Sequence, residues 1–460
     1  MKLLPKHLVT LGALGISALA SSAHAGGFAL IEQGASGLGN AYAGAGAVAS
    51  DASTVWFNPA GITELPAREL AVAGHAISAN TKFTDQGTIL NQQLGGSPLS
   101  GPDTAEPGGT TIVPNFYYIA PINDKLSYGL GISVPFGSST EYDVDWKGRY
   151  TTVKSAVNAI DINPVLAYRV SDKFRIGGGI SIQTLSAELE QAVDSGGVCL
   201  ATAGAADPAI CLNAGLAPGV QTNDGYGAIS GDSTAISFNF GMLFLPTPET
   251  RIGVAYRAET SHELDGDADF TTDPTLQTFL TAGGSSLFSD TGIKGEIDLP
   301  ASLSFSVAHK MNDKLELLGD ATWTGWSSFK QLLIEYDNAE QPDTLSIQDW
   351  DDVWRVSAGL NYQLNEKVTL RAGLAFDQEA IPSPQRRTAR IPGNDRTWIA
   401  IGAGYALNKN ASLDFGFTHL SLDETPIDNA APESRGAPTV RGNYDASVNI
   451  VSAQFSWKFN

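Results

Sequence analysis

Residues 353–379 read VWRVSAGLNYQLNEKVTLRAGLAFDQE, and this stretch decides the fold. Its first half places Trp354 and Val356 on one face and Arg355 and Ser357 on the other. An Asn-Glu-Lys turn follows, and a second alternating run begins directly after it. A period of two with one apolar face predicts two antiparallel β-strands joined by a tight turn.

The same pattern recurs along the chain. Short polar turns stand at residues 123–125, 171–173, 312–314, 365–367 and 408–410, between alternating strands of about ten residues. Apolar and polar faces on strands of that length predict an all-β transmembrane barrel, with lipid outside and a polar lumen inside. Short turns would face the periplasm and long loops the outside. The fourteen expected antiparallel strands cover 68–83, 110–120, 125–136, 157–170, 173–189, 233–246, 250–262, 293–310, 314–336, 352–363, 367–379, 396–407, 411–421 and 446–459.

The N-terminus predicts export. Lys2 and Lys6 precede an apolar run over residues 8–20, and Ala23-His24-Ala25 forms a small-residue exit. These are the parts of a secretory signal peptide, assigned here to residues 1–25. The apolar run is too short for a stable membrane helix, and no later run of about eighteen apolar residues occurs. The expected location is therefore the bacterial outer membrane.

Composition limits the partners. The formal net charge of -21 argues against nucleic acid. Acidic loops could hold divalent cations among lipopolysaccharides, although solvated acidic faces are the favoured explanation. Cys199 and Cys211 lie in one Gly/Ala-rich segment, and an exported chain predicts a loop disulfide between them rather than a metal site. No metal and no cofactor are expected. The expected partners are a hydrophobic ligand, lipopolysaccharide and outer-membrane lipid, and the protein is expected to be a monomer.

Residues 26–66 do not follow the strand pattern. They are rich in small residues, carry little charge and end in Trp56-Phe57-Asn58-Pro59-Ala60-Gly61. A barrel of fourteen strands is too wide for its own side chains to fill. We therefore expect residues 26–66 to form a hatch inside the lumen and residues 67–460 to form the barrel, with a periplasmic tail as the alternative for the first segment.

Three ordered blocks carry a resemblance to a known family. They are GGFAL, SGLGNAYAG and NPA at residues 26–30, 36–44 and 58–60; YIAPIND at 118–124; and IPGNDRTW, GAGY and NASLD at 391–398, 402–405 and 410–414. Together they resemble the FadL/TodX family of outer-membrane transporters for long-chain fatty acids and hydrophobic compounds. The resemblance implies a fourteen-strand barrel, an N-terminal hatch and a substrate path that leaves sideways through the wall.

Specific residues follow from the resemblance. The hatch motif would be Asn58, Pro59 and Ala60, and a rearrangement around Phe28 would open the passage. The lateral opening would lie at a kink in the third strand, whose residues here are Pro135, Phe136 and Gly137. The residue types agree, because proline removes a ladder donor and glycine leaves room for an inward bend.

The resemblance also implies a ligand groove on an external loop, formed here by Leu276, Phe279, Leu280, Leu287 and Phe288. Packing of this loop on the barrel rim is the alternative. Fatty-acid members place a cationic pair near the bound carboxylate, but the matching positions here are Gln191 and Asp351, which leaves neutral substrates open. Other cations that could contact a head group are Arg149, Arg355 and Arg396, unless they pair with carboxylates in the lumen.

The expected function is import of long-chain fatty acids or other hydrophobic compounds, by capture on external loops, binding in a plugged lumen and lateral release through the kink in strand 3. A general or hydrocarbon-selective porin is the alternative, and a structural or adhesive barrel is a further one. An enzyme is not expected, because His75, His262, His309 and His419 lie in no recognisable nucleophile motif.

Overall fold

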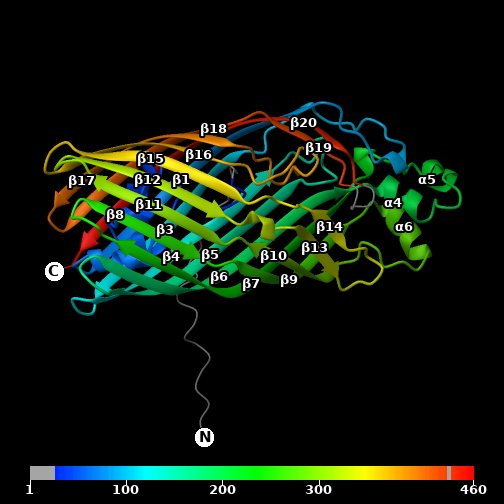
Figure 1. Ribbon diagram of the computed structural model, residues 1–460. Helices are drawn as coiled ribbons and strands as arrows, with labels where there is room; N and C mark the ends of the chain where they lie inside the picture. Colours follow the sequence, from blue (N-terminus) through cyan, green and yellow to red (C-terminus); the bar gives the residue numbers. More distant parts are fainter. Residues whose placement is uncertain (1–25, 432–436, 460) are drawn as a thin grey trace, which may run out of the picture.

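The computed structural model describes residues 26–431 and 437–459, and the expected signal peptide lies outside the described residues. The protein is a closed antiparallel barrel of fourteen wall strands, as the alternation predicts (Figure 1). The last strand, β20 (Val440–Lys458), pairs along its length with the first, β1 (Glu69–Asp85), and this pairing closes the wall. No helix among the described residues is long and apolar enough to cross a membrane.

Ten of the wall strands consist of one segment, or of one segment with a short extension. In chain order they are β1, β3 (Gly109–Pro121), β4 (Leu126–Glu141), β5 (Lys154–Arg169), β6 (Phe174–Val193), β7 (Gly225–Phe244), β16 (Val368–Asp377), β17 (Arg396–Asn408), β18 (Ala411–Leu422) and β20; β2 (Thr104–Ala105) extends the pairing of β1, and β19 (Thr425–Asn429) that of β20.

The seventh to tenth wall strands are each interrupted, which the sequence did not predict. The segments are β8 (Thr250–Arg257) and β9 (Thr260–Thr271), β10 (Thr291–Leu299) and β11 (Ser302–Lys310), β12 (Leu315–Thr324) and β13 (Gln331–Tyr336), and β14 (Thr344–Ile347) and β15 (Val353–Gln363). The expected strands 250–262, 293–310 and 314–336 are therefore wrong as unbroken elements. The expected start of the sixth strand at residue 233 is also wrong, because β7 begins at Gly225.

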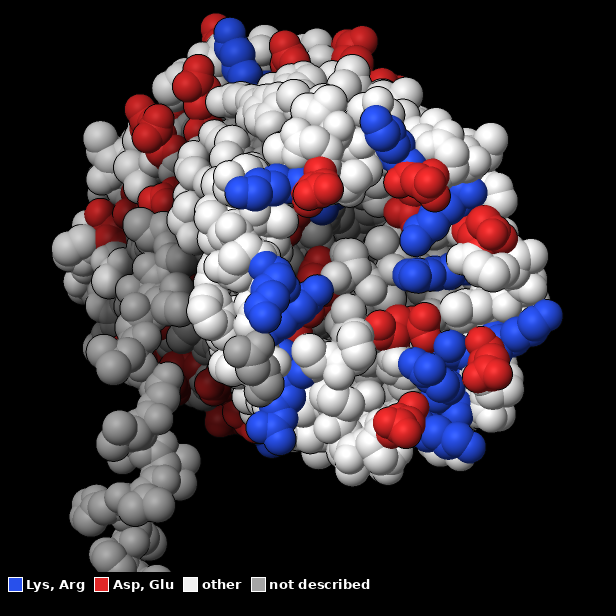
Figure 2. Space-filling model, turned by 90° about the vertical axis from the view of Figure 1, so that its left-hand side faces the viewer, with Lys and Arg blue, Asp and Glu red and all other residues white. Residues whose placement is uncertain are grey.

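The short polar turns connect neighbouring strands at the end of the barrel where the chain terminates (Figure 1). Asn312 shows how the sequence forms them: its side-chain oxygen accepts hydrogen bonds from the backbone N–H groups of Lys314 and Leu315 at 2.9 and 3.0 Å. Asn123 and Asn365 make the same pair of bonds. An Asn side chain that bonds the backbone two and three residues later fixes a tight turn. Seen from this end, Lys and Arg are interspersed with Asp and Glu around the rim (Figure 2).

The predicted faces are confirmed along the quoted stretch. Trp354 and Val356 are 43% and 47% exposed on the outer surface, whereas Arg355 and Ser357 are buried toward the lumen. Exposed apolar residues of this kind recur around the wall, and they form the surface that a membrane would cover.

The opposite end carries the long loops and the helices α4 (Ser195–Ala201), α5 (Ala209–Asn213) and α6 (Pro274–Ala282) (Figure 1). Short 3₁₀ helices occur at η2 (Gln92–Leu94), η3 (Gln221–Asn223) and η4 (Trp326–Ser328). The N-terminal segment contains α1 (Ala35–Leu38), α2 (Ala45–Val48), α3 (Thr54–Phe57) and η1 (Pro59–Glu64). Its side chains and backbone contact residues of β4, β7, β11, β15, β18 and β20, strands from all around the wall.

Candidate functional site

The third wall strand, β4, is irregular at Pro135. Its register with β5 shifts between Ser133 and Phe136. On its other side β4 pairs with β3 only as far as Ile132. Proline lacks the N–H that a ladder requires, so a break at this position follows from the sequence. Within the described wall, the part of β4 beyond Ile132 therefore has no ladder with β3.

The N-terminal residues bind this irregular part of β4. Leu30 donates its N–H to the carbonyl of Pro135 at 2.8 Å, and Gly137 donates its N–H to the carbonyl of Phe28 at 3.0 Å. Ala29 and Phe136 thereby form a β-bridge. A Cβ atom on Gly137 would lie 3.1 Å from the side chain of Leu30, so glycine permits this close approach. Residues 28–30 thus act as a short strand against the kink.

The Asn-Pro-Ala motif holds the other end of the N-terminal segment. The side chain of Asn58 is fully buried and accepts a hydrogen bond from the N–H of Ala60 at 3.1 Å, which caps η1. The same side chain donates to the carbonyls of Gly46 and Met242 at 2.7 and 2.9 Å. Because Met242 belongs to β7, Asn58 joins η1, α2 and the wall in one arrangement.

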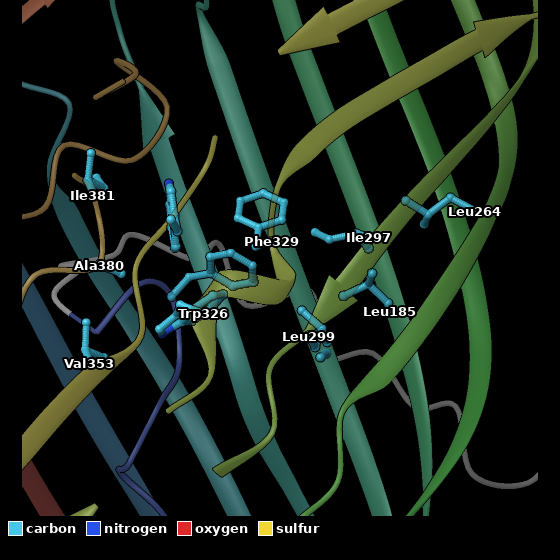
Figure 3. Packing of buried hydrophobic residues seen from close by; sticks show 12 residues of the cluster. Leu185, Leu264, Ile297, Leu299, Trp326, Phe329, Val353, Ala380 and Ile381 are labelled. Atoms are coloured by element: carbon cyan, nitrogen blue, oxygen red, sulfur yellow. The ribbon is translucent and has the colours of Figure 1, made fainter. Parts of the chain in front are cut away.

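Phe28 lies in a buried hydrophobic cluster. Trp326 and Phe329 of the same cluster lie close together (Figure 3). The ring centroid of Phe28 is 4.9 Å from Trp326, 5.9 Å from Phe329, 6.1 Å from Trp350 and 6.0 Å from Phe136. Trp326, Phe329 and Trp350 come from the interruptions of the ninth and tenth wall strands. The sequence reading missed Trp326 and Phe329 because it treated the ninth strand as continuous. It missed Trp350 because it placed this residue in the connection before the tenth strand.

Gly27 allows this packing. It has a positive φ of +64°, and a Cβ atom there would lie 2.3 Å from the Trp326 ring. Trp326 also donates its indole N–H to the carbonyl of Gly26 at 2.6 Å. The first described residues are therefore held by both the β4 kink and the ninth strand.

An apolar chamber adjoins Phe28. Apolar side chains from β5, β6, β7, β9, β10 and β13 line it, including Val157, Leu189, Ile229, Ile297 and Ile334. Phe28 and Phe329 form one part of its lining. A chamber of this composition can take a hydrocarbon chain.

Among the described residues, Arg390 is the one charged residue that lines the apolar chamber. Its guanidinium donates to the carbonyl of Thr151 at 2.6 Å, to the amide oxygen of Gln191 at 3.0 Å and to the hydroxyl of Thr152 at 3.3 Å. All three partners are neutral, and no carboxylate of the described residues lies within ion-pair distance. Burial lowers the pKa of Arg390 to about 10, so the group stays charged at neutral pH. Sequence reasoning missed Arg390, although it stands directly before the IPGNDRTW block.

The three cations named from the sequence have other surroundings. Arg149 is fully buried, and its Nε binds Asp224 at 2.7 Å. Arg396 lies 3.3 Å from Asp377. Arg355 donates to the carbonyl of Ala41 at 2.8 Å and lies over the ring of Trp398. None of them lines the apolar chamber, but Arg355 and Arg396 line a second cavity next to Leu30 and Phe136, which we call the mixed cavity.

The external loop residues divide into two groups. Leu276 and Leu280 of α6 are buried against the disulfide between Cys199 and Cys211, which joins α4 to α5. The remaining three, Phe279, Leu287 and Phe288, are partly buried and pack against that cluster. Asp273 caps α6 by accepting from the N–H of Thr275 at 2.7 Å. The described residues contain no cluster of His, Cys, Asp and Glu that could hold a metal ion.

Known proteins of similar sequence are outer membrane proteins. The family model described as "Outer membrane protein transport protein (OMPP1/FadL/TodX)" matches residues 16–459. The chain is 30% identical over 463 residues to the "Putative outer membrane protein NMB0088" of Neisseria meningitidis, with 97% of each chain covered. It is 28% identical over 422 residues to the "Long-chain fatty acid transport protein" of Escherichia coli K12, covering 89% of this chain and 90% of that one.

Solved structures share the fold. A FadL homologue of Pseudomonas aeruginosa superposes with a TM-score of 0.84 at 24% identity, covering 94% of this chain and all of the other. The toluene transporter TodX of Pseudomonas putida gives a TM-score of 0.66 at 17% identity, covering 93% of this chain and 98% of that one.

Proposed function

Because the chain belongs to the OMPP1/FadL/TodX family of outer membrane transport proteins, we propose that it imports long-chain fatty acids through a chamber closed by its N-terminal segment. The family membership itself makes the protein a transporter of hydrophobic compounds in the bacterial outer membrane and not an enzyme. The substrate class and the route are the parts that we propose.

The surroundings of Arg390 support the proposal that the substrate is an acid. A charged guanidinium that borders an apolar chamber and bonds only neutral oxygens provides a partner for a carboxylate. Gln191, which the family resemblance matches to a cation of the fatty-acid members, accepts a bond from Arg390. The guanidinium therefore reaches the expected head-group position from a different loop.

The chamber would supply most of the affinity. Burying a sixteen-carbon chain contributes on the order of 12 kcal/mol at ~0.8 kcal/mol per methylene, before ordering costs. A hydrogen bond between the head group and a cation adds only about 1.5 to 3 kcal/mol. The apolar wall thus governs affinity, and Arg390 governs the choice between acid and neutral chain.

Release would take place sideways at β4. Residues 28–30 cover the part of β4 that lacks a ladder with β3. A ligand in the apolar chamber touches Phe28 and Phe329, whose rings pack together. Displacement of Phe28 would withdraw the residues that cover the kink and open the wall beside Phe136. In this proposal residues 26–66 are the hatch, α6 and its loop capture the ligand first, and a monomer surrounded by lipopolysaccharide suffices.

The head-group proposal is tested with Arg390→Gln, in protein purified in detergent. We expect palmitate to bind about tenfold or more weakly, while hexadecanol binds as before, because only the charge-assisted bond is lost. Arg386→Gln is the control, since Arg386 belongs to the same loop but pairs with Asp349. Equal binding of palmitate and hexadecanol by the unchanged protein would instead favour the hydrocarbon alternative. The neutral Gln191 and the acidic Asp351 favour that alternative, because neither side chain carries a positive charge.

The release proposal is tested with Gly137→Phe. The added ring would meet Leu30 and fill the space at the kink. We expect slower uptake of labelled oleate by cells that depend on this protein, with normal barrel assembly. Gly74→Phe is the control, because a Cβ there meets nothing within 4 Å. Unchanged uptake in Gly137→Phe would count against the lateral route at β4.

A further inference from the structure

The wall ladder is also interrupted between β7 and the strand formed by β8 and β9. β7 pairs with β8 from Asn239 to Phe244 and with β9 from Tyr226 to Asp232. Residues 233–238 and 258–264 between these parts form no ladder with each other, and we call this stretch the β7/β9 seam. One backbone bond, from Ala258 to the carbonyl of Phe238 at 2.9 Å, spans the seam at its edge.

An extra residue in the seventh strand causes the seam. In β8 the inward-facing positions are odd-numbered, as Arg257 is, whereas in β9 they are even-numbered, as the buried His262 and Leu264 are. The inward-facing residues of β7 keep one parity throughout, from Gly227 to Leu243. The register must therefore shift at residues 258–259, as it does at a β-bulge, and bulges weaken the local ladder.

The mixed cavity connects this seam to the β4 kink. Leu30, Pro135 and Phe136 line the cavity on one side, and Ser237, Phe238 and Thr260 line it on the other. A ligand that has passed Phe28 would thus enter a space that touches both the β4 kink and the β7/β9 seam.

The seam is polar on its cavity side and apolar on its outer side, which matches the polar head and apolar chain of an amphiphile. Facing the cavity are the hydroxyls of Ser237 and Thr260, which bond each other at 2.8 Å, followed by Ser302 and Thr324. On the outer surface Phe238 is 57% exposed and packs on Tyr256 with ring centroids 6.1 Å apart. A carboxylate could exchange hydrogen bonds with the hydroxyls while its hydrocarbon chain enters the membrane.

We propose that the β7/β9 seam is a second lateral exit, used by single-chain amphiphiles with a carboxylate head group. The inference rests on the proposed function, because the ligand must first pass Phe28 to reach the mixed cavity. Opening the seam separates the hydroxyl pair of Ser237 and Thr260 and the edge hydrogen bond from Ala258, at a place where the register pairs of a continuous ladder are missing.

An engineered disulfide tests the seam without disturbing assembly. The 2.8 Å separation of the Ser237 and Thr260 hydroxyls places cysteine sulfurs there within bonding reach. Ser237→Cys with Thr260→Cys is oxidised after the barrel has assembled. The control pair is Asp232→Cys with Asp265→Cys, register partners on the intact ladder of the same strands. It also reports any effect of the oxidant or reductant on the natural disulfide.

The readout is uptake of labelled oleate, before and after oxidation and again after reduction. Two parallel exits of similar rate predict a reversible fall of about two-fold in the oxidised seam pair and none in the control. In the Gly137→Phe background the oxidised seam pair should remove the remaining uptake. Unchanged uptake in the oxidised seam pair overturns the second exit.

The uptake measurements distinguish the two proposed exits. If Gly137→Phe alone abolishes uptake, the seam is not an exit and release through β4 stands. If the oxidised seam pair alone abolishes uptake while Gly137→Phe has no effect, the seam stands and release through β4 is wrong.

Discussion

Replacement of Phe28 by alanine should release the N-terminal residues from the kink. The Phe28 ring is 2% exposed and contacts four aromatic rings at centroid distances between 4.9 and 6.1 Å. Truncation of a buried phenylalanine costs about 3 to 5 kcal/mol. Most of this loss should fall on the local closure of residues 28–30, because the barrel ladder does not depend on Phe28.

Amide hydrogen exchange measures that closure directly. The N–H groups of Leu30 and Gly137 are bonded across the interface between the segment and β4. A loss of about 3 kcal/mol in local opening free energy predicts exchange roughly 100-fold faster at both amides. Peptides covering residues 26–33 and 130–140 report them by mass spectrometry in detergent micelles.

The control for this experiment is Phe57→Ala. Phe57 belongs to the same segment but packs on Tyr42, with ring centroids 5.6 Å apart, and not on the kink. Exchange at Leu30 and Gly137 should then stay near its original rate. Equal exchange in Phe28→Ala and the unchanged protein would refute the role of Phe28 in closing the kink.

Three further predictions concern stability. Asn58→Ala removes hydrogen bonds to Ala60, Gly46 and Met242 and should lower the unfolding free energy in micelles by about 2 to 4 kcal/mol, whereas Asn91→Ala, which removes the cap of the exposed helix η2, should have less effect. Replacing Cys199 and Cys211 by serine should cost the external loop about 3 kcal/mol, so that protease cleaves this loop faster while the barrel keeps its heat-modifiable migration. Burial raises the pKa of Glu379 from 4.5 to about 7, against the opposing effect of its partner Arg387. The stability that protonated Glu379 gives to the loop of residues 378–395 is fully present below about pH 4.5 and is lost as the pH rises through about 7, and protection factors of this loop should lose that dependence in Glu379→Gln.

The sequence predicted the barrel well because two physical rules act at every strand. Lipid outside and a polar lumen inside impose a period of two, which assigns Trp354 and Arg355 to opposite faces. The Asn side chains of the short turns, such as Asn312, bond the following backbone and mark where each strand ends. Both signals are local, so neighbouring residues suffice to read them.

The interruptions of the seventh to tenth strands could not be predicted from these local signals. A bulge changes the inward face by one residue, and residues 258–259 carry no proline or glycine to mark it. Pro300 between β10 and β11 was such a marker, but the alternation on both sides concealed it. The inward position of Trp326 and Trp350 depends on contacts with Phe28, far away in the sequence.

Arg390 was hidden for a similar reason. The residue lies in a loop, where no periodicity assigns a side chain to the lumen, and its partner Gln191 is 199 positions away. The family resemblance directed attention to Gln191 and Asp351, which lack the expected charge. Only the folded loop shows that a cation reaches Gln191 from elsewhere.

The measurement that tests the account most directly is a crystal structure of the protein with a fatty acid that carries bromine at its methyl end. The account predicts anomalous signal from the bromine within the apolar chamber among Val157, Ile229 and Ile297, and the carboxylate on the guanidinium of Arg390. A ligand found only outside the wall, or a lumen in which residues 28–30 leave an open channel without ligand, would contradict it.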